Sequence, residues 1–211
     1  MLPATAVIGF LLAVTPLVLT PGASFTLVTA RGAVGDRRGA WATILGTAAG
    51  IATHAVLAGA GLAAVVMQSA ELYRILRLLG AVYLVALGVS LLWRARATPT
   101  DHREDGSAEA PSPGAAHGRR AFVANVLNVK AAAVYFPLAP QFVPETMVSA
   151  GAMLQLALVH IGVMVAWLGL WSTGLLALGT RWDIAAWRRW IDRSGGAVLV
   201  LLGVRTAAAE R

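Results

Sequence analysis

The sequence contains no cysteine, and only 13% of its 211 residues are charged. The missing cysteines exclude disulfide bonds and thiol chemistry. Long stretches carry no charge at all: between Met1 and Arg31, between Arg38 and Glu71, and between Glu145 and Arg181. Apolar residues make up 58% of the chain, whereas a soluble domain has roughly 45–50%. A water-facing surface cannot hold this excess, so the composition indicates an integral membrane protein.

Familiar catalytic signatures are also missing from the chain. It has no His-Glu-x-x-His, no Gly-x-Ser-x-Gly and no phosphate-binding loop, so we expect neither an enzyme nor a pump driven by nucleotides, and no cofactor. The net charge of +7 often indicates nucleic-acid binding. Here the basic residues sit in short segments between apolar runs, which membrane topology explains better. We therefore expect the lipid bilayer, not nucleic acid, as a partner; homo-oligomerisation stays open.

Six apolar segments are long enough to be considered as membrane spans, each of which needs roughly 20 residues. They cover residues 3–28, 41–68, 75–93, 121–143, 150–178 and 191–206. The sixth is the weakest, since only Gly195 to Val204 is strictly apolar, and it is expected to be short, tilted or half-interfacial. The prediction is an all-α integral membrane protein with six transmembrane helices.

Residues 94–120 differ from the rest of the chain because Pro, Gly, Ser, Ala and mixed charges dominate them. Such a segment buries too little apolar surface to order itself, so it is predicted to be a flexible cytoplasmic loop. It separates a first three-helix half, residues 1–93, from a second, residues 121–211.

The distribution of arginine predicts the orientation. With the N-terminus outside, the inside loops hold twelve arginines and the outside segments four, which satisfies the positive-inside rule. The inside set is Arg31, Arg37, Arg38, Arg94, Arg96, Arg103, Arg119, Arg120, Arg181, Arg188, Arg189 and Arg193, and the outside set is Arg74, Arg77, Arg205 and Arg211. Tryptophans prefer the interface, and five fall at the predicted cytoplasmic one: Trp41, Trp93, Trp182, Trp187 and Trp190.

The two halves share a pattern that suggests an internal duplication. Residues 80–89 read GAVYLVALGV and residues 195–204 read GGAVLVLLGV, with six identical positions out of ten. With three spans in each half, the second half would be inverted in the membrane. Inverted repeats are a common transporter architecture with the site at the repeat interface, so we predict a 3+3 inverted repeat.

The first candidate site segment is Thr20-Pro21-Gly22-Ala23-Ser24. Proline and glycine interrupt a helix, and an interrupted helix is tolerated in a membrane where protein or water lines it. Pro21, Gly22 and Ser24 are therefore candidates for binding a substrate through exposed backbone. A kink that only shapes packing is the alternative.

The second candidate segment contains Asn125, Asn128 and Lys130. Lys130 is the one charge in the middle of an apolar span, and a charge there costs at least about 2.5 kcal/mol. It could bind a substrate carboxylate, pair with a backbone carbonyl, or snorkel to the interface. The two asparagines are three residues apart and so share a helix face. We favour a substrate-binding role for all three.

His54 and His160 lie near the middle of their spans. Histidine exchanges protons near neutral pH, so both are candidates for proton coupling. A metal site and a plain interhelical hydrogen bond remain alternatives, although two histidines without carboxylate or thiolate are a thin ligand set. Gly46 and Gly50 are spaced for close helix approach and are interpreted as packing residues.

Taken together, these segments resemble the LysE/RhtB family of bacterial amino-acid exporters over nearly the whole chain. The family's Pro-Gly-Pro motif corresponds to Pro21-Gly22-Ala23, and its Asn-Pro-Lys motif to Asn128-Val129-Lys130, so each motif lacks one proline here. Its other features match Gly46 and Gly50, Gly80-Ala81-Val82-Tyr83-Leu84, Tyr135-Phe136 and Gln141-Phe142.

The resemblance implies a multi-pass protein of the bacterial inner membrane that exports a small amino acid or derivative by using the proton gradient or the membrane potential. The spans contain no acid to pair a cationic side chain, so we hypothesise a neutral amino acid or an amino-acid derivative. The expected mechanism is alternating access of the two halves. Efflux of a metal or other ion by the same architecture is the alternative.

Overall fold

The computed structural model describes residues 1–96, 114–178 and 184–208, and no strand occurs among them. The expectation of an all-helical chain is thus confirmed for the described residues. The helices are α1 (Ala4–Leu19), α2 (Ala23–Ala33), α3 (Arg37–Gln68), α4 (Ala70–Arg94), α5 (Gly114–Val126), α6 (Val129–Ala133), α7 (Ala150–Leu178) and α8 (Ile184–Ala208). Three short turns follow α6: the π-helical η1 (Val134–Leu138) and the 3-10 turns η2 (Ala139–Phe142) and η3 (Glu145–Met147).

Two of the six expected segments are broken helices. α1 and α2 are bent by 54° relative to each other, and the helical run from Val129 to Phe142 is bent by 55° relative to α5. α5 also begins at Gly114 and not at residue 121, so it takes up part of the expected loop. Residues 97–113, with Arg103, and 179–183, with Arg181 and Trp182, lie outside the described residues.

The number of membrane spans is smaller than expected when it is judged by length and apolar composition alone. Within the described residues, α3 and α7 qualify individually, and the count rises to four if each bent pair is one span. α4 contains only a shorter apolar stretch, Leu78–Ser90, and α8 is not among the helices that are long and apolar enough to qualify. Charges near the ends of α4 and α8 lower their hydropathy, so six spans stays a prediction.

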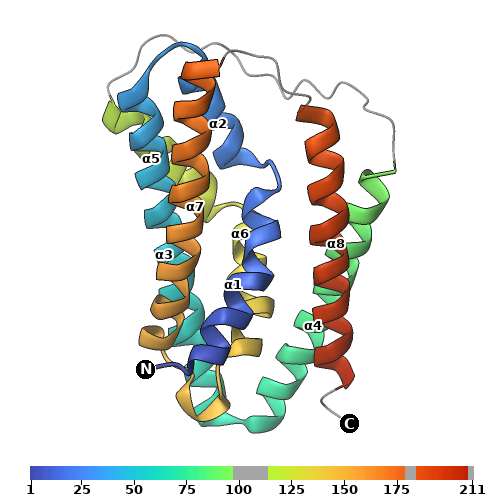
Figure 1. Ribbon diagram of the computed structural model, residues 1–211. Helices are drawn as coiled ribbons and strands as arrows, with labels where there is room; N and C mark the ends of the chain where they lie inside the picture. The colour runs from blue at the N-terminus through green and yellow to red at the C-terminus, as the bar shows by residue number, and fades with distance from the viewer. Residues whose placement is uncertain (97–113, 179–183, 209–211) are drawn as a thin grey trace.

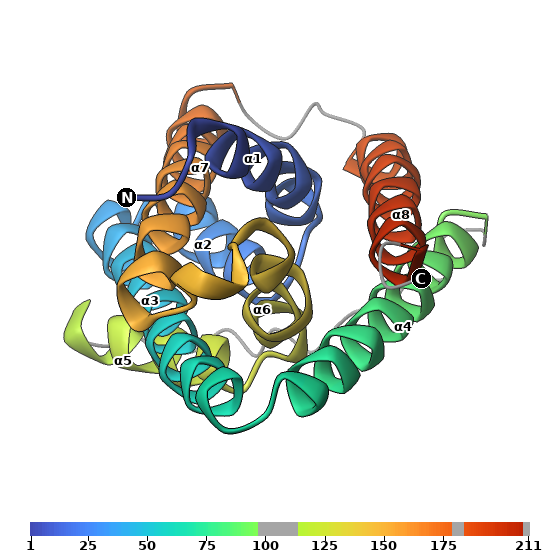
Figure 2. The same cartoon turned by 90° about the horizontal axis from the view of Figure 1, so that it is seen from below.

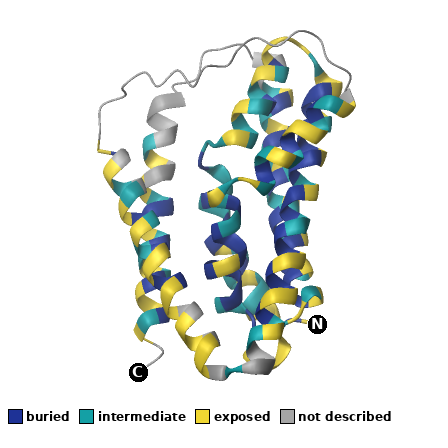
Figure 3. Cartoon of the chain, turned by 180° about the vertical axis from the view of Figure 1, so that it is seen from behind, coloured by how far each residue is buried: buried dark blue, intermediate teal, exposed yellow. Residues whose placement is uncertain are grey.

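Exposed residues recur along the helices of the bundle (Figure 3), and many of them are large and apolar. Leu12, Leu45, Leu158, Leu170 and Leu201 are each 64–70% exposed. Such a surface is unfavourable in water and suits lipid tails, as expected for a transmembrane protein.

The helices form a bundle in which α6 lies near the centre and α1, α3 and α7 lie on the rim, with α4 and α8 paired antiparallel at its side (Figures 1 and 2). The start of α1 and the end of α8 lie at the same end of the molecule (Figure 1). The turn between α2 and α3, residues 34–36, lies at the other end, together with the start of α5. The two ends of the described chain therefore emerge on one side.

Close approach of α3 and α5 depends on Gly46 and Gly50. A Cβ atom on Gly46 would lie 2.0 Å from the carbonyl oxygen of Gly118, and one on Gly50 would lie 2.6 Å from Asn125 Oδ1. The packing role expected for this glycine pair is confirmed. It brings the end of α5 against the middle of α3.

Replacing Gly46 with alanine should destabilise the protein. An alanine in a helix normally gains about 1 kcal/mol over glycine, but here the methyl group would meet backbone, and overpacking costs about 1–3 kcal/mol. We expect a lower melting temperature for Gly46→Ala in detergent micelles. Gly61→Ala in the same helix is the control, because nothing lies within 4 Å of its Cβ position. Equal melting temperatures for the two variants would contradict the proposed contact.

Candidate functional site

The first break separates α1 from α2 at residues Thr20, Pro21 and Gly22. Proline disfavours helical backbone at the preceding residue, and Thr20 is extended with φ −66° and ψ 120°. Gly22 is the N-cap of α2 and offers no side-chain cap, so the first backbone N–H groups of α2 have no side-chain partner from their own N-cap. Pro16 lies inside α1 without ending it.

The second break separates α5 from α6 at Leu127 and Asn128. Asn128 is the N-cap of α6, and its Oδ1 accepts a hydrogen bond from the backbone N–H of Lys130 at 2.9 Å. An N-cap of this kind typically stabilises a helix by about 1 kcal/mol. Asn128 thus starts a new helix where the first one stops, without a proline at residue 129.

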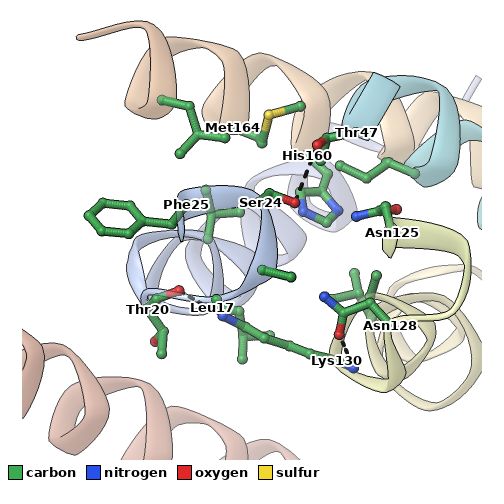
Figure 4. Close-up of a pocket in the computed structure, with 17 residues that line it drawn as sticks. Leu17, Thr20, Ser24, Phe25, Thr47, Asn125, Asn128, Lys130, His160 and Met164 are labelled. Carbon is green, nitrogen blue, oxygen red and sulfur yellow. Dashed lines mark hydrogen bonds between the residues drawn. The ribbon is translucent and has the colours of Figure 1, made fainter. Parts of the chain in front are cut away.

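Lys130 joins the two breaks. Its Nζ donates a hydrogen bond to the carbonyl oxygen of Thr20 at 2.8 Å (Figure 4). Thr20 is the C-cap residue of α1. Unpaired carbonyls at the C-terminal end of a helix carry partial negative charge, which favours a cation. Of the readings left open by the sequence, pairing with a backbone carbonyl is the one that the structure shows.

His54 makes a similar contact with a backbone carbonyl at the C-terminal end of α5. Its Nε2 lies 3.1 Å from the carbonyl oxygen of Asn125, and because a carbonyl only accepts, this nitrogen donates. His54 is 5% exposed. Each interrupted helix therefore has a basic side chain from another helix at its C-terminal end.

A cavity lies where the two breaks meet (Figure 4). α2 contributes its first turn, α6 contributes Lys130, and α7 contributes His160 and Met164. Within the described residues no Asp or Glu lines this cavity, and Lys130 is its one formally charged side chain. Ammonium and backbone N–H donors thus face the cavity, and such a set suits an anionic group such as a carboxylate.

Most of the residues singled out in the sequence come together here. Gly22, Ser24, Asn125, Asn128, Lys130 and His160 line the cavity, whereas Pro21 and His54 do not. Asn125 is 5% exposed, and its Oδ1 has no hydrogen-bond partner among the described residues. A buried amide oxygen without a partner is costly, and it is available to a donor on a ligand.

Sequence reasoning missed several lining residues. Thr47, Phe25, Met164 and Leu168 line the cavity, and Thr47 donates to Ser24 Oγ at 3.3 Å. Thr47 could have been found, because it lies seven residues before His54 and therefore on the same face of the helix. The apolar members carry no signal that distinguishes them from ordinary span residues.

The described residues contain no group of three or more His, Cys, Asp or Glu side chains arranged to hold a metal ion. No observation on the structure therefore favours metal efflux over export of an organic solute.

Comparison with known proteins gives consistent results. The model of the family described as LysE type translocator matches residues 15–210. A homoserine/homoserine lactone efflux protein of Salmonella typhimurium is 31% identical over 209 residues, 96% of both chains. A leucine efflux protein of Klebsiella pneumoniae is 31% identical over 127 residues, 60% of this chain and 58% of that protein.

An uncharacterized membrane protein of Vibrio cholerae is 32% identical over 143 residues, 66% of this chain and 65% of that protein. No solved structure matches the chain. The family model covers nearly the entire chain and includes both helix breaks. The protein therefore belongs to the LysE family of translocators.

Proposed function

We propose that this protein exports a small neutral amino acid or amino-acid derivative across the bacterial inner membrane, with the proton gradient as the driving force. The observation that carries the proposal is the cavity at two helix breaks, joined by the Lys130 Nζ to Thr20 hydrogen bond. Broken helices that expose their ends to a central site are typical of secondary transporters.

The proposed mechanism is alternating access of two inverted halves, residues 1–93 and 121–211. The two breaks have nearly equal bends, 54° and 55°. Contacts between α4 and α8 are also reciprocal. A Cβ on Gly88 would lie 2.7 Å from the Gly196 oxygen, and one on Gly203 would lie 2.7 Å from the Ala81 oxygen.

These two contacts are equivalent under the sequence repeat, which aligns Gly88 with Gly203 and Ala81 with Gly196. A two-fold axis in the membrane plane would relate them in this way. In an inverted repeat with six spans both termini lie on one side. The arginine distribution supports the outside of the cell for that side.

The substrate class follows from the chemistry of the cavity. A carboxylate fits beside Lys130 and the first turn of α2, and an ammonium can donate to Asn125 Oδ1. Phe25, Met164 and Leu168 leave an apolar wall for the side chain. The absence of Asp and Glu from the described lining disfavours a cationic side chain. Homoserine and leucine, named for two relatives, have side chains of the expected kind.

Proton coupling is assigned to His160, which lines the cavity, with His54 as the second candidate. Both are buried, at 7% and 5% exposed. Histidine is the side chain whose ordinary proton affinity suits exchange near neutral pH. A proton and the substrate ammonium would compete for the same small space.

Replacing Lys130 with methionine should abolish export. The change keeps the length of the side chain but removes the charge and the bond to Thr20, and a charged hydrogen bond contributes about 1.5–3 kcal/mol. We expect efflux of labelled amino acid from preloaded cells to fall about tenfold or more at matched membrane abundance. Arg205→Ala, which removes a charge at the exposed end of α8, should export normally.

Equal export by wild type and Lys130→Met would show that Lys130 serves only as a snorkelling or structural side chain. If neither moves any amino acid, the proposed substrate class is wrong, and metal ions become the next substrates to test.

The substrate range gives a separate prediction. Cells that express the wild type should export homoserine or leucine faster than control cells, but not arginine or lysine, because the described lining of the cavity offers a cationic side chain no acidic partner. Efflux of a mixture of labelled amino acids, separated by chromatography, measures this directly. Export of arginine or lysine would refute the assignment of a neutral substrate.

A further inference from the structure

An aromatic cluster lies beside the cavity, where α2 packs against α7. Phe25 is the member of the cluster that lines the cavity. Its ring centroid is 4.8 Å from that of Trp171 and 6.5 Å from that of Trp167, with interplanar angles of 38° and 17°. The centroids of the two tryptophans are 5.9 Å apart, and neither residue lines the cavity. Aromatic pairs stabilise one another beyond the area that they bury, so the ring of Phe25 is supported on the side away from the cavity.

Hydrogen bonds hold this support in place. Phe25 and Thr29 are four residues apart on α2 and therefore share a helix face. Trp171 Nε1 donates to Thr29 Oγ1 at 2.9 Å, and Thr29 Oγ1 donates to the Phe25 carbonyl oxygen at 2.7 Å. These bonds fix the indole ring of Trp171 to α2 one turn beyond Phe25. If the Phe25 ring were pushed away from the cavity, it would meet this anchored indole.

Phe25 lies at the apolar end of the cavity. Figure 4 shows its ring on the side of the α2 start that is away from Asn125 and Asn128. The proposed position of the substrate carboxylate is beside Lys130 and the first turn of α2. A side chain that extends from there away from the two asparagines points toward Phe25.

The other two residues of the apolar wall are less suited to limit the size of a side chain. Met164 and Leu168 are 4% and 3% exposed, so most of their surface is covered by neighbouring residues. Methionine is also unbranched and adapts its shape to its surroundings. Phe25 is only half-buried, and its ring is rigid. It therefore presents a larger and stiffer surface to a substrate.

The space within the cavity is small. Its free volume is about 70 Å³, whereas a dry apolar cavity that binds benzene measures about 150 Å³. The backbone of an amino acid must fit in the same space. No room is then left for a phenyl ring while Phe25 keeps its position.

We propose that Phe25 sets the upper size limit of the exported side chain, and that Trp171 is a positioning residue that holds the Phe25 ring at this limit. The proposal rests on the proposed function of amino-acid export. It narrows the substrate class to neutral amino acids with side chains smaller than a benzyl group. One methylene group in a hydrophobic pocket already changes selectivity about 10–200-fold, so a whole ring is sufficient for strong selection.

The size limit can be measured with the purified full-length protein in proteoliposomes. The measured quantity is kcat/KM for efflux of labelled alanine, homoserine, leucine and phenylalanine, a series of increasing size. We expect the wild type to discriminate about tenfold or more against phenylalanine relative to leucine. Phe25→Ala should raise kcat/KM for phenylalanine about tenfold or more, because it frees volume. It should lower kcat/KM for alanine, because a small side chain then loses contact with the ring.

Two further variants make this result specific. Phe25→Leu removes less of the wall, so it should give a value for phenylalanine between those of the wild type and Phe25→Ala, and it replaces Phe25→Ala if that variant does not fold. Phe136→Ala is the matched control, since Phe136 is 48% exposed and does not line the cavity. It should keep the preference of the wild type. Melting temperatures in detergent micelles identify the folded variants.

Thr29 tests the support of the ring from outside the cavity. Thr29→Val keeps the shape of the side chain but removes the acceptor for Trp171 Nε1. Export of phenylalanine relative to leucine should rise about fivefold, the equivalent of one hydrogen bond of about 1 kcal/mol. Thr29→Ser keeps the hydroxyl and should keep the preference of the wild type. If Thr29→Val changes kcat/KM for all four amino acids by one factor, Trp171 does not position Phe25.

The outcomes separate this proposal from the export function. If the wild type exports phenylalanine as efficiently as leucine, no size limit exists, and the export function stands. If folded Phe25→Ala and Phe25→Leu lower kcat/KM for all four amino acids alike, Phe25 is a packing residue, and the export function again stands. If the wild type moves none of the four, the proposed function itself is wrong, and the size limit falls with it.

Discussion

The hydrogen bond from Lys130 Nζ to the Thr20 carbonyl, 2.8 Å long, is the contact on which the site depends. An ammonium in the middle of a membrane span costs at least about 2.5 kcal/mol, and an unpaired carbonyl at a helix end is also unfavourable in lipid. Each group offsets the penalty of the other. The same bond holds the end of α1 against the start of α6, so the two breaks open onto one cavity.

The breaks persist although each family motif lacks a proline, with Ala23 and Val129 in those positions. At the first break Pro21 and Gly22 suffice to interrupt the helix. At the second, Asn128 caps α6 through its side chain, and His54 donates to the Asn125 carbonyl. Capping groups thus take the place of the missing prolines, because a broken helix is stable only when its free backbone groups have hydrogen-bond partners.

Close packing at small residues brings these hydrogen-bond partners together. Gly46 and Gly50 let α5 approach α3 closely, and this approach brings the Asn125 carbonyl within reach of His54. Glycines also line the α4–α8 contact. In lipid there is little hydrophobic force between helices, so such close contacts decide how they associate. Residues that look only structural in this chain therefore control the geometry of the cavity.

The sequence by itself determined the class of the protein and the first helix break, and it singled out Lys130 as a charge within an apolar span. These follow from local physics: the transfer of apolar side chains into lipid, the backbone restrictions of Pro21 and Gly22, and the cost of a charge in hydrocarbon. Only the tertiary structure decided which groups these residues contact and where the second broken segment begins. Lys130 binds a carbonyl 110 residues earlier in the chain, His160 meets Tyr135, Pro21 stays out of the cavity, and α5 starts at Gly114. Such contacts depend on how helices that are distant in the sequence pack against each other. The spacing of residues along one helix does not reveal which residues of another helix they will contact.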